Sequence, residues 1–154
     1  MALNLAEALS SIVTQADAAD WRAAIRLAGD GLVAGGATTE AYTDEMIDAV
    51  EKHGPYIVIA PGIALAHSRP SPAVLTGGLS WVGLATPVEF GNKANDPVTL
   101  VIGLAAKDHD AHLQVMRALA GVLSDSEAMT QLHTAATPDD VRGVLGALAA
   151  AAAA

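Results

Sequence analysis

The sequence predicts an α/β fold, a single-domain sandwich in which one central mixed β-sheet is covered by helices on both faces. Apolar residues recur at helical spacing in the first third of the chain, change to short β-branched runs near Tyr56, and return to helical spacing after Asp108. With no internal repeat and no interdomain linker, residues 1–154 fit one domain with a core at about 20–148. We expect the Ala-rich tail, residues 149–154, to fray or to continue the last helix without a cap.

Two amphipathic helices are expected in the first third of the chain. The first begins behind Asp20, a residue type that suits an N-cap, and ends at the Gly-Gly pair of residues 35–36. The second follows Thr39 and stops at residues 53–55, a His-Gly-Pro sequence typical of a helix end. The residues before Trp21 are expected to form a shorter, looser helical segment. The apolar faces of the two main helices carry Trp21, Ile25, Ala28 and Leu32, and Tyr42, Met46, Ala49 and Val50.

Short β-branched runs predict the strands of the sheet. The first covers residues 56–60, and residues 63–65 are a candidate for a further strand. A long strand over residues 74–85 is loosened by glycines, and residues 98–104 form the clearest strand of the chain. Residues 68–72 hold two prolines within three positions, so they can form neither a helix nor a central strand and are predicted to be a loop.

Helical periodicity returns in the last third of the chain. One helix is expected behind Asp108 or Asp110, and a short helix around Met129 and Leu132 follows it. The last helix opens with the Thr-Pro-Asp-Asp sequence of residues 137–140, which supplies an N-cap, a proline at the first helical position and two carboxylates for the helix dipole. The buried stripes are expected to hold Val115, Met116, Leu119, Val122 and Leu123, and Val141, Val144, Leu145 and Leu148.

The composition excludes several kinds of chemistry and partner. The chain has no cysteine, which rules out disulfides, thiol nucleophiles, thiolate metal sites and iron–sulfur clusters. Its 8 basic and 17 acidic residues give a formal net charge of −9, which would repel a phosphate backbone. We therefore expect no nucleic-acid partner, and any covalent chemistry must use oxygen or nitrogen atoms.

The sequence gives no reason to expect a membrane segment. Every Val/Leu/Ile-rich run is interrupted by glycine, proline or charge before it reaches the ~20 strongly apolar residues that a span needs. The first residues lack the basic region of a signal peptide, and Glu7 interrupts their apolar run. We therefore expect a cytoplasmic protein that is not embedded in a membrane.

The histidines are the first candidates for a functional site. His53 and His133 lie near helix ends, where an imidazole often does no more than interact with terminal carbonyls. His67 lies between an apolar strand and the proline-rich loop, a place where α/β proteins commonly carry functional groups. A single loop histidine is nevertheless more often only solvated. His109 and His112 lie near the start of a predicted helix.

A metal site and a phosphate-binding loop both have weak support. His109 and His112, with Asp108 and Asp110, could ligate zinc, but their spacing is not the i, i+4 pair of metalloprotease helices and no nearby glutamate is placed as a base. Neither Gly-Gly pair is followed by the Gly-Lys-Ser/Thr sequence of a P-loop, and no serine or threonine lies in a nucleophile elbow. We expect neither a metal nor a cofactor.

A histidine in a loop beside a helix N-terminus suits the transfer of a phosphoryl group. Neutral imidazole is nucleophilic at neutral pH, and a hydrogen bond to one ring nitrogen selects the other for attack. The phosphoryl group then needs donors, which free backbone N–H groups at a helix start and a second imidazole would supply. His112 can serve His67 in this way only if the fold brings its helix beside the loop.

A family resemblance adds to this interpretation. Residues 61–67, PGIALAH, resemble the active-site signature of type-2 enzyme IIA proteins of the bacterial sugar phosphotransferase system, in which a Gly-x-Ala-x-Pro-His run ends in the phosphorylated histidine. Within this mannitol/fructose class, the chain resembles the ascorbate-type branch most, over most of its length from about residue 20. The segments that carry this likeness are residues 54–62, 69–70, 87–90, 95–98 and 105–113.

The chain departs from the family pattern at three places. The family's proline before the histidine is Ala66 here, and the small residue after it is Ser68, so the loop is expected to be less rigid. In the mannitol and fructose branches an upstream Arg-Glu pair assists the site, and the corresponding stretch here is Glu51-Lys52. We do not transfer that arginine's role to either residue.

The resemblance implies a phosphoryl carrier without a cofactor. His67 would accept phosphate from the histidine phosphocarrier protein HPr and pass it to an enzyme IIB cysteine, with His112 as the second active-site histidine. A separate membrane component, enzyme IIC, would import a sugar or an ascorbate-like acid. Two alternatives stay open: a regulatory protein in which phosphorylation of His67 gates a protein partner, and an α/β binding module in which the motif has decayed.

Overall fold

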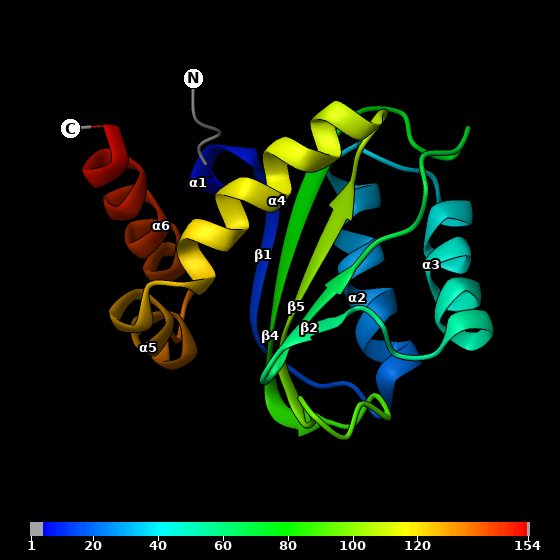
Figure 1. The fold of residues 1–154 in the computed structure, drawn as a ribbon, viewed down its shortest axis with the longest axis horizontal. Helices are drawn as coiled ribbons and strands as arrows, with labels where there is room; N and C mark the ends of the chain where they lie inside the picture. The colour runs from blue at the N-terminus through cyan, green and yellow to red at the C-terminus, as the bar shows by residue number, and fades with distance from the viewer. Residues whose placement is uncertain (1–4, 154) are drawn as a thin grey trace.

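One five-stranded sheet with helices on both faces organises the chain (Figure 1). The computed structural model describes residues 5–153. Within that range the elements are α1 (Leu5–Ala8), β1 (Leu9–Ala16), α2 (Trp21–Ala34), α3 (Glu40–His53), β2 (Val58–Ala60), β3 (Ile63–Ala66), β4 (Gly78–Val88), β5 (Val98–Ala105), α4 (His109–Leu123), α5 (Ser126–Thr134) and α6 (Pro138–Ala153).

The sheet has the strand order β1-β4-β5-β3-β2 and is mixed. The central strand β5 pairs antiparallel with β4 and parallel with β3, while β1 is parallel to β4 and β2 antiparallel to β3. In the β3–β5 register Ala66 lies opposite Gly103. Because parallel neighbours end at the same edge of a sheet, the residue after β3 and the start of α4 after β5 lie at one edge.

The two faces of the sheet carry separate apolar clusters, as predicted. α2 and α3 cover one face, and α1, α4, α5 and α6 cover the other (Figure 1). The first cluster includes Ile25, Leu32, Tyr42, Met46, Val50, Val82 and Val101. The second includes Leu65, Trp81, Ile102, Leu104, Leu119, Met129, Leu132, Val141 and Leu145. Burial of such apolar area is the main term that stabilises the layers.

Side-chain caps begin several of the helices at the predicted residues. An Asp20 carboxylate oxygen accepts the Ala23 N–H at 2.9 Å, and an Asp108 oxygen accepts the Ala111 N–H at 2.8 Å. Asp108 rather than Asp110 is therefore the N-cap of α4. The second helix, α3, ends as predicted at Gly54, whose φ of +83° falls in a region that favours glycine.

The prediction for the residues before Trp21 was wrong for residues 9–16, because these form the edge strand β1. Leu9 and Ile12 both pack into the second apolar cluster. These two buried residues are three positions apart in the sequence, a spacing that is also typical of a helix. A register shift between Leu9 and Ser11 places them on one face despite the strand's period of two. Among the described residues before Trp21, only the four of α1, Leu5–Ala8, are helical.

Two predicted strand boundaries were also wrong. The strand expected at 56–60 begins only at Val58, because a turn precedes it in which the Val58 N–H donates to the Pro55 carbonyl at 3.2 Å. The strand expected at 74–85 starts at Gly78 and continues to Val88, since Leu75 N–H is bonded instead to Ala37 O at 2.8 Å. The candidate strand at 63–65 is confirmed as β3, and residues 68–72 are a loop.

Both ends of the described chain are helical. Helix α6 continues through the Ala-rich segment to Ala153, while Ala154 and the first four positions considered for a signal peptide lie outside the described residues. Over residues 5–153, no helix combines the length and the apolar character needed to cross a bilayer.

Gly103 lets α2 approach the middle of the sheet. A Cβ at this position would overlap the Ser80 side chain and lie 3.2 Å from both the Cβ and the carbonyl oxygen of Ala28. We expect Gly103→Ala to lower the free energy of unfolding by about 1–3 kcal/mol through overpacking. Chemical denaturation followed by circular dichroism measures this change.

Gly121 provides the matched control, since a Cβ there would meet nothing within 4 Å on the exposed side of α4. Gly121→Ala should raise the free energy of unfolding by roughly 0.5–1 kcal/mol, because glycine is a poor helix former. Equal effects of the two substitutions would contradict the close approach of α2 to β5.

Candidate active site at the ends of β3 and β5

His67 follows β3 directly and has one ring nitrogen fixed. Its Nδ1 lies 2.8 Å from the carbonyl oxygen of Leu65. A carbonyl oxygen only accepts hydrogen bonds, so Nδ1 carries the proton and Nε2 keeps its lone pair in the neutral ring. The Leu65 contact thus holds the ring in one tautomer. Because the side chain is only half-buried, Nε2 is available as a nucleophile.

His112 lies in the first turn of α4, and the structure brings it beside His67. The two ring centroids are 5.6 Å apart, with the planes tilted by 45°. Burial lowers the pKa of His112 from its ordinary value of 6.5, and the positive charges that His67 and His109 can carry lower it further. His112 is therefore neutral at neutral pH and offers one N–H donor and one acceptor.

Two aromatic contacts extend the row of rings on the other side of His67. Tyr56 meets His67 edge-to-face, with centroids 5.8 Å apart and an interplanar angle of 81°, and meets His53 in the same manner at 6.3 Å. Burial raises the pKa of Tyr56, and the charge of Arg69 opposes this rise. The sequence argument missed His53 and Tyr56, because nothing in the linear pattern shows that the end of α3 meets the loop after β3.

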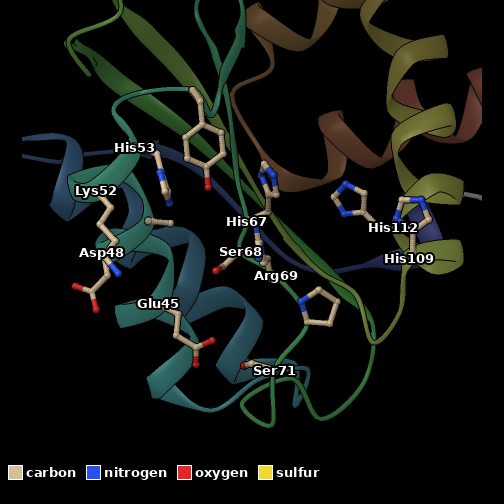
Figure 2. A pocket seen from close by; sticks show the side chains of 13 residues that line it. Glu45, Asp48, Lys52, His53, His67, Ser68, Arg69, Ser71, His109 and His112 are labelled. Atoms are coloured by element: carbon tan, nitrogen blue, oxygen red, sulfur yellow. The ribbon is translucent and has the colours of Figure 1, made fainter.

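These rings line an open cleft of about 1010 Å³. In Figure 2, Glu45, Asp48 and Lys52 extend from α3 on one side, His109 and His112 from α4 on the other, and His67 lies between them. The lining holds four of the five histidines and two permanent cations, Lys52 and Arg69. Two carboxylates of the lining, Glu45 and Asp48, balance these two cations, so the suitability of the cleft for an anion rests on the N–H groups and the protonation of its histidines.

Tyr42 anchors the loop that carries His67. Its Oη accepts the backbone N–H of Ser68 at 2.9 Å and lies 2.9 Å from the Leu104 carbonyl oxygen and 3.1 Å from that of Ser68. The residue is 1% exposed. Burial raises the pKa of Tyr42 to about 12, so the hydroxyl is protonated and donates to these carbonyls at any physiological pH.

The start of α4 offers fewer free donors than the sequence argument expected. The Ala111 N–H already donates to the Asp108 carboxylate, and the His112 N–H donates to the Asp108 carbonyl at 3.2 Å. The imidazole of His112 is thus the better-placed donor at this end of the helix.

His133, on α5, is not brought to the cleft and lines a separate cavity of about 220 Å³.

The departures from the motif have a structural context. Ala66 is fully buried at the end of β3, and both backbone polar groups of Ser68 contact Tyr42, so the loop is anchored without a proline at position 66. Upstream, Glu51 forms an ion pair with Arg22 at 2.9 Å, whereas Lys52 lines the cleft.

Over the part of the chain that the structure describes, no group of three or more His, Asp or Glu side chains could hold a metal ion.

The chain is similar to known enzyme IIA proteins in sequence and in fold. An ascorbate-specific PTS system EIIA component of Escherichia coli strain K12 is 37% identical over 143 residues, which cover 92% of this chain and 93% of that protein. A crystal structure of a putative PTS IIA domain from Streptococcus pyogenes is 30% identical and superposes with a TM-score of 0.85, covering 96% of this chain and 98% of that one.

A third relative is seen together with a partner. The structure of enzyme IIA for mannitol in complex with phosphorylated enzyme IIB, from Escherichia coli, matches with a TM-score of 0.78 and 29% identity, over 88% of this chain and 94% of that one. Residues 8–147 match the family described as phosphoenolpyruvate-dependent sugar phosphotransferase system, EIIA 2. The chain therefore belongs to the type-2 EIIA family of phosphotransferase-system proteins.

Proposed function

We propose that this chain is a phosphoryl carrier that accepts a phosphoryl group on Nε2 of His67 from HPr and passes it to the cysteine of an enzyme IIB. The observation that carries the proposal is the 2.8 Å contact between His67 Nδ1 and the Leu65 carbonyl, which leaves Nε2 as the free nucleophile in a cleft suited to an anion. Membership of the EIIA 2 family supports it.

The transfer steps balance without any cofactor. In the first step the Nε2 lone pair forms a bond to phosphorus, while the donor's N–P bond breaks and its electron pair returns to the donor imidazole. In the second step a IIB thiolate attacks phosphorus, and the electron pair of the N–P bond returns to Nε2. The Nδ1 proton stays in place throughout, so the phosphorylated ring is cationic, and the Leu65 carbonyl oxygen stabilises that charge.

His112 is proposed to stabilise the phosphoryl group while it is on His67. Phosphoryl transfer depends mainly on positioning and on stabilisation of the charge spread over the equatorial oxygens. A neutral His112 donates one hydrogen bond, and it gains a proton more readily once an anion is beside it. Lys52 and Arg69 line the same cleft and carry charge of the required sign, while Glu45 and Asp48 of the lining carry the opposite charge.

The relatives indicate the partners and the class of transported substrate. The complex of the mannitol relative with phosphorylated IIB supports an enzyme IIB as the acceptor for this chain. The ascorbate-specific relatives support an ascorbate-like acid as the substrate that a membrane enzyme IIC would import. A regulatory protein would also accept phosphate on His67, but it need not discharge the group to a IIB cysteine.

The proposed carrier should take up phosphate on His67 alone and then release it. We expect phosphorylated HPr to label the chain with a group that is labile in acid and stable in base, as a phosphoramidate is, and His67→Ala to remain unlabelled at every time point. Addition of a IIB protein should discharge the label, and a IIB cysteine-to-serine variant is the control. A label on His109 or His133, or one that never leaves, would contradict the carrier function.

Loss of His112 should slow transfer without preventing it. Removal of one preorganised donor typically costs ~10²–10³ in rate, so His112→Ala should still be labelled, at a rate lower by about that factor. Quenched-flow measurement with labelled phosphate gives both rates. His133→Ala is the matched control, because that exposed histidine lies outside the cleft, and it should transfer at the parent rate. An unchanged rate for His112→Ala would remove His112 from the site.

The charge state of His112 should report on phosphorylation. NMR titration of the unphosphorylated protein should place the pKa of His112 below the ordinary value of 6.5. Phosphorylation of His67 should raise this pKa, because the phosphoryl group puts negative charge beside His112, where the free His67 ring can only be neutral or positive.

A lowered pKa of His112 in the folded state means that the unfolded state binds more protons as pH falls. The contribution of His112 to stability therefore falls below about pH 6.5. An unperturbed or raised pKa in the free protein would contradict the half-buried position.

A further inference from the structure

We propose that the hydroxyl group of Tyr42 is a positioning group for phosphoryl transfer, which holds the His67 loop so that the ring keeps its Nδ1 bond and presents Nε2 to the cleft. This inference rests on the proposed function of His67. Tyr42 touches neither the reacting nitrogen nor the place where the phosphoryl group would be. It acts instead through the backbone of Ser68.

The hydroxyl joins three parts of the chain that are far apart in sequence. Tyr42 lies on α3, 26 residues before Ser68, and its partner Leu104 lies 62 residues away near the end of β5. Strands β3 and β5 are paired only as far as Ala66 and Gly103, so the chain after β3 has no ladder partner to continue along. The Tyr42 hydroxyl bridges this opening between the first loop residues and the end of β5.

Each hydrogen-bonding group at this bridge has a defined role. The oxygen accepts the Ser68 N–H, and its single hydrogen is shared between the carbonyls of Leu104 and Ser68, at 2.9 and 3.1 Å. Two of these three contacts hold the backbone of Ser68, and the third ties the hydroxyl to the end of β5. Because the phenol ring is fully buried in the first apolar cluster, under α2 and α3, the hydroxyl itself has little freedom to move.

The position of Ser68 decides the geometry of His67. The ring of His67 reaches back to the carbonyl two residues earlier, so the bond to Leu65 requires a particular turn of the backbone between β3 and the loop. With Ser68 fixed by Tyr42, the backbone on both sides of His67 is held. Without the hydroxyl, the loop could relax, the Nδ1 bond would be made for a smaller fraction of the time, and Nε2 would be displaced.

The test compares Tyr42→Phe with Ser80→Ala. Tyr42→Phe removes only the hydroxyl and keeps the buried ring. Ser80→Ala removes another fully buried hydroxyl, which lies on β4, donates to the Ala28 carbonyl of α2 at 2.7 Å and does not line the cleft. Both variants should lose roughly 2–8 °C in melting temperature, which matches them in stability.

Only Tyr42→Phe should change the site itself. In ¹⁵N NMR spectra of the unphosphorylated protein, the His67 ring should show pure Nδ1–H tautomer in the parent and in Ser80→Ala, and a mixture of tautomers in Tyr42→Phe. The rate of phosphoryl uptake from HPr should fall by roughly ten- to a hundredfold in Tyr42→Phe, the scale expected for a displaced reacting group, and should be unchanged in Ser80→Ala. Parent-like His67 spectra and rates in Tyr42→Phe would overturn the proposal.

Two features keep this inference separate from the carrier function. The tautomer measurement needs no phosphoryl donor, so it can support or overturn the role of Tyr42 even if the parent protein took up no phosphate. Hydrogen exchange of the parent protein needs no variant at all. The Ser68 amide should be protected, as a donor to the buried hydroxyl, although it lies in a half-exposed loop, and fast exchange at this amide would refute the bridge.

Discussion

The parallel pairing of β3 with β5 brings the two candidate site histidines together at one edge of the sheet. Two parallel neighbours end at the same edge of a sheet, so the loop after β3 and the helix after β5 must begin side by side. His67 is the first residue of that loop and His112 lies in the first turn of that helix. The 5.6 Å separation of their rings follows from the strand register and from the short connection between β5 and α4.

Hydrogen bonds to backbone carbonyls then fix the orientation of the His67 ring and of the loop that carries it. The Leu65 carbonyl selects the tautomer of His67, and the Tyr42 hydroxyl holds the next peptide against the end of β5. Neither contact is an ion pair, so neither is weakened by salt as a surface ion pair is. The ion pairs between α2 and α3, Arg22–Glu51 and Arg26–Asp44, are in contrast well exposed and contribute little to the fixed geometry.

Sequence patterns predicted the mixed sheet, its two covered faces and most elements, because β5 and the main helices have strong periodicity. They failed at β1, where a register shift gives an edge strand the spacing of a helix. The motif pointed to His67 as a candidate, but the approach of His112 depended on which strands pair, and that is a long-range property. His53, Tyr56 and Tyr42 were missed as parts of the site for the same reason, since their contacts join segments with no shared local signal.

The central claim is that Nε2 of His67 carries the phosphoryl group while Nδ1 keeps its proton against the Leu65 carbonyl. Long-range ¹H–¹⁵N and ³¹P NMR of the phosphorylated, ¹⁵N-labelled protein tests it most directly. The account predicts phosphorus coupled to Nε2 of His67 and a proton retained on Nδ1. Phosphorus bound to Nδ1 of His67, or to any other histidine, would contradict it.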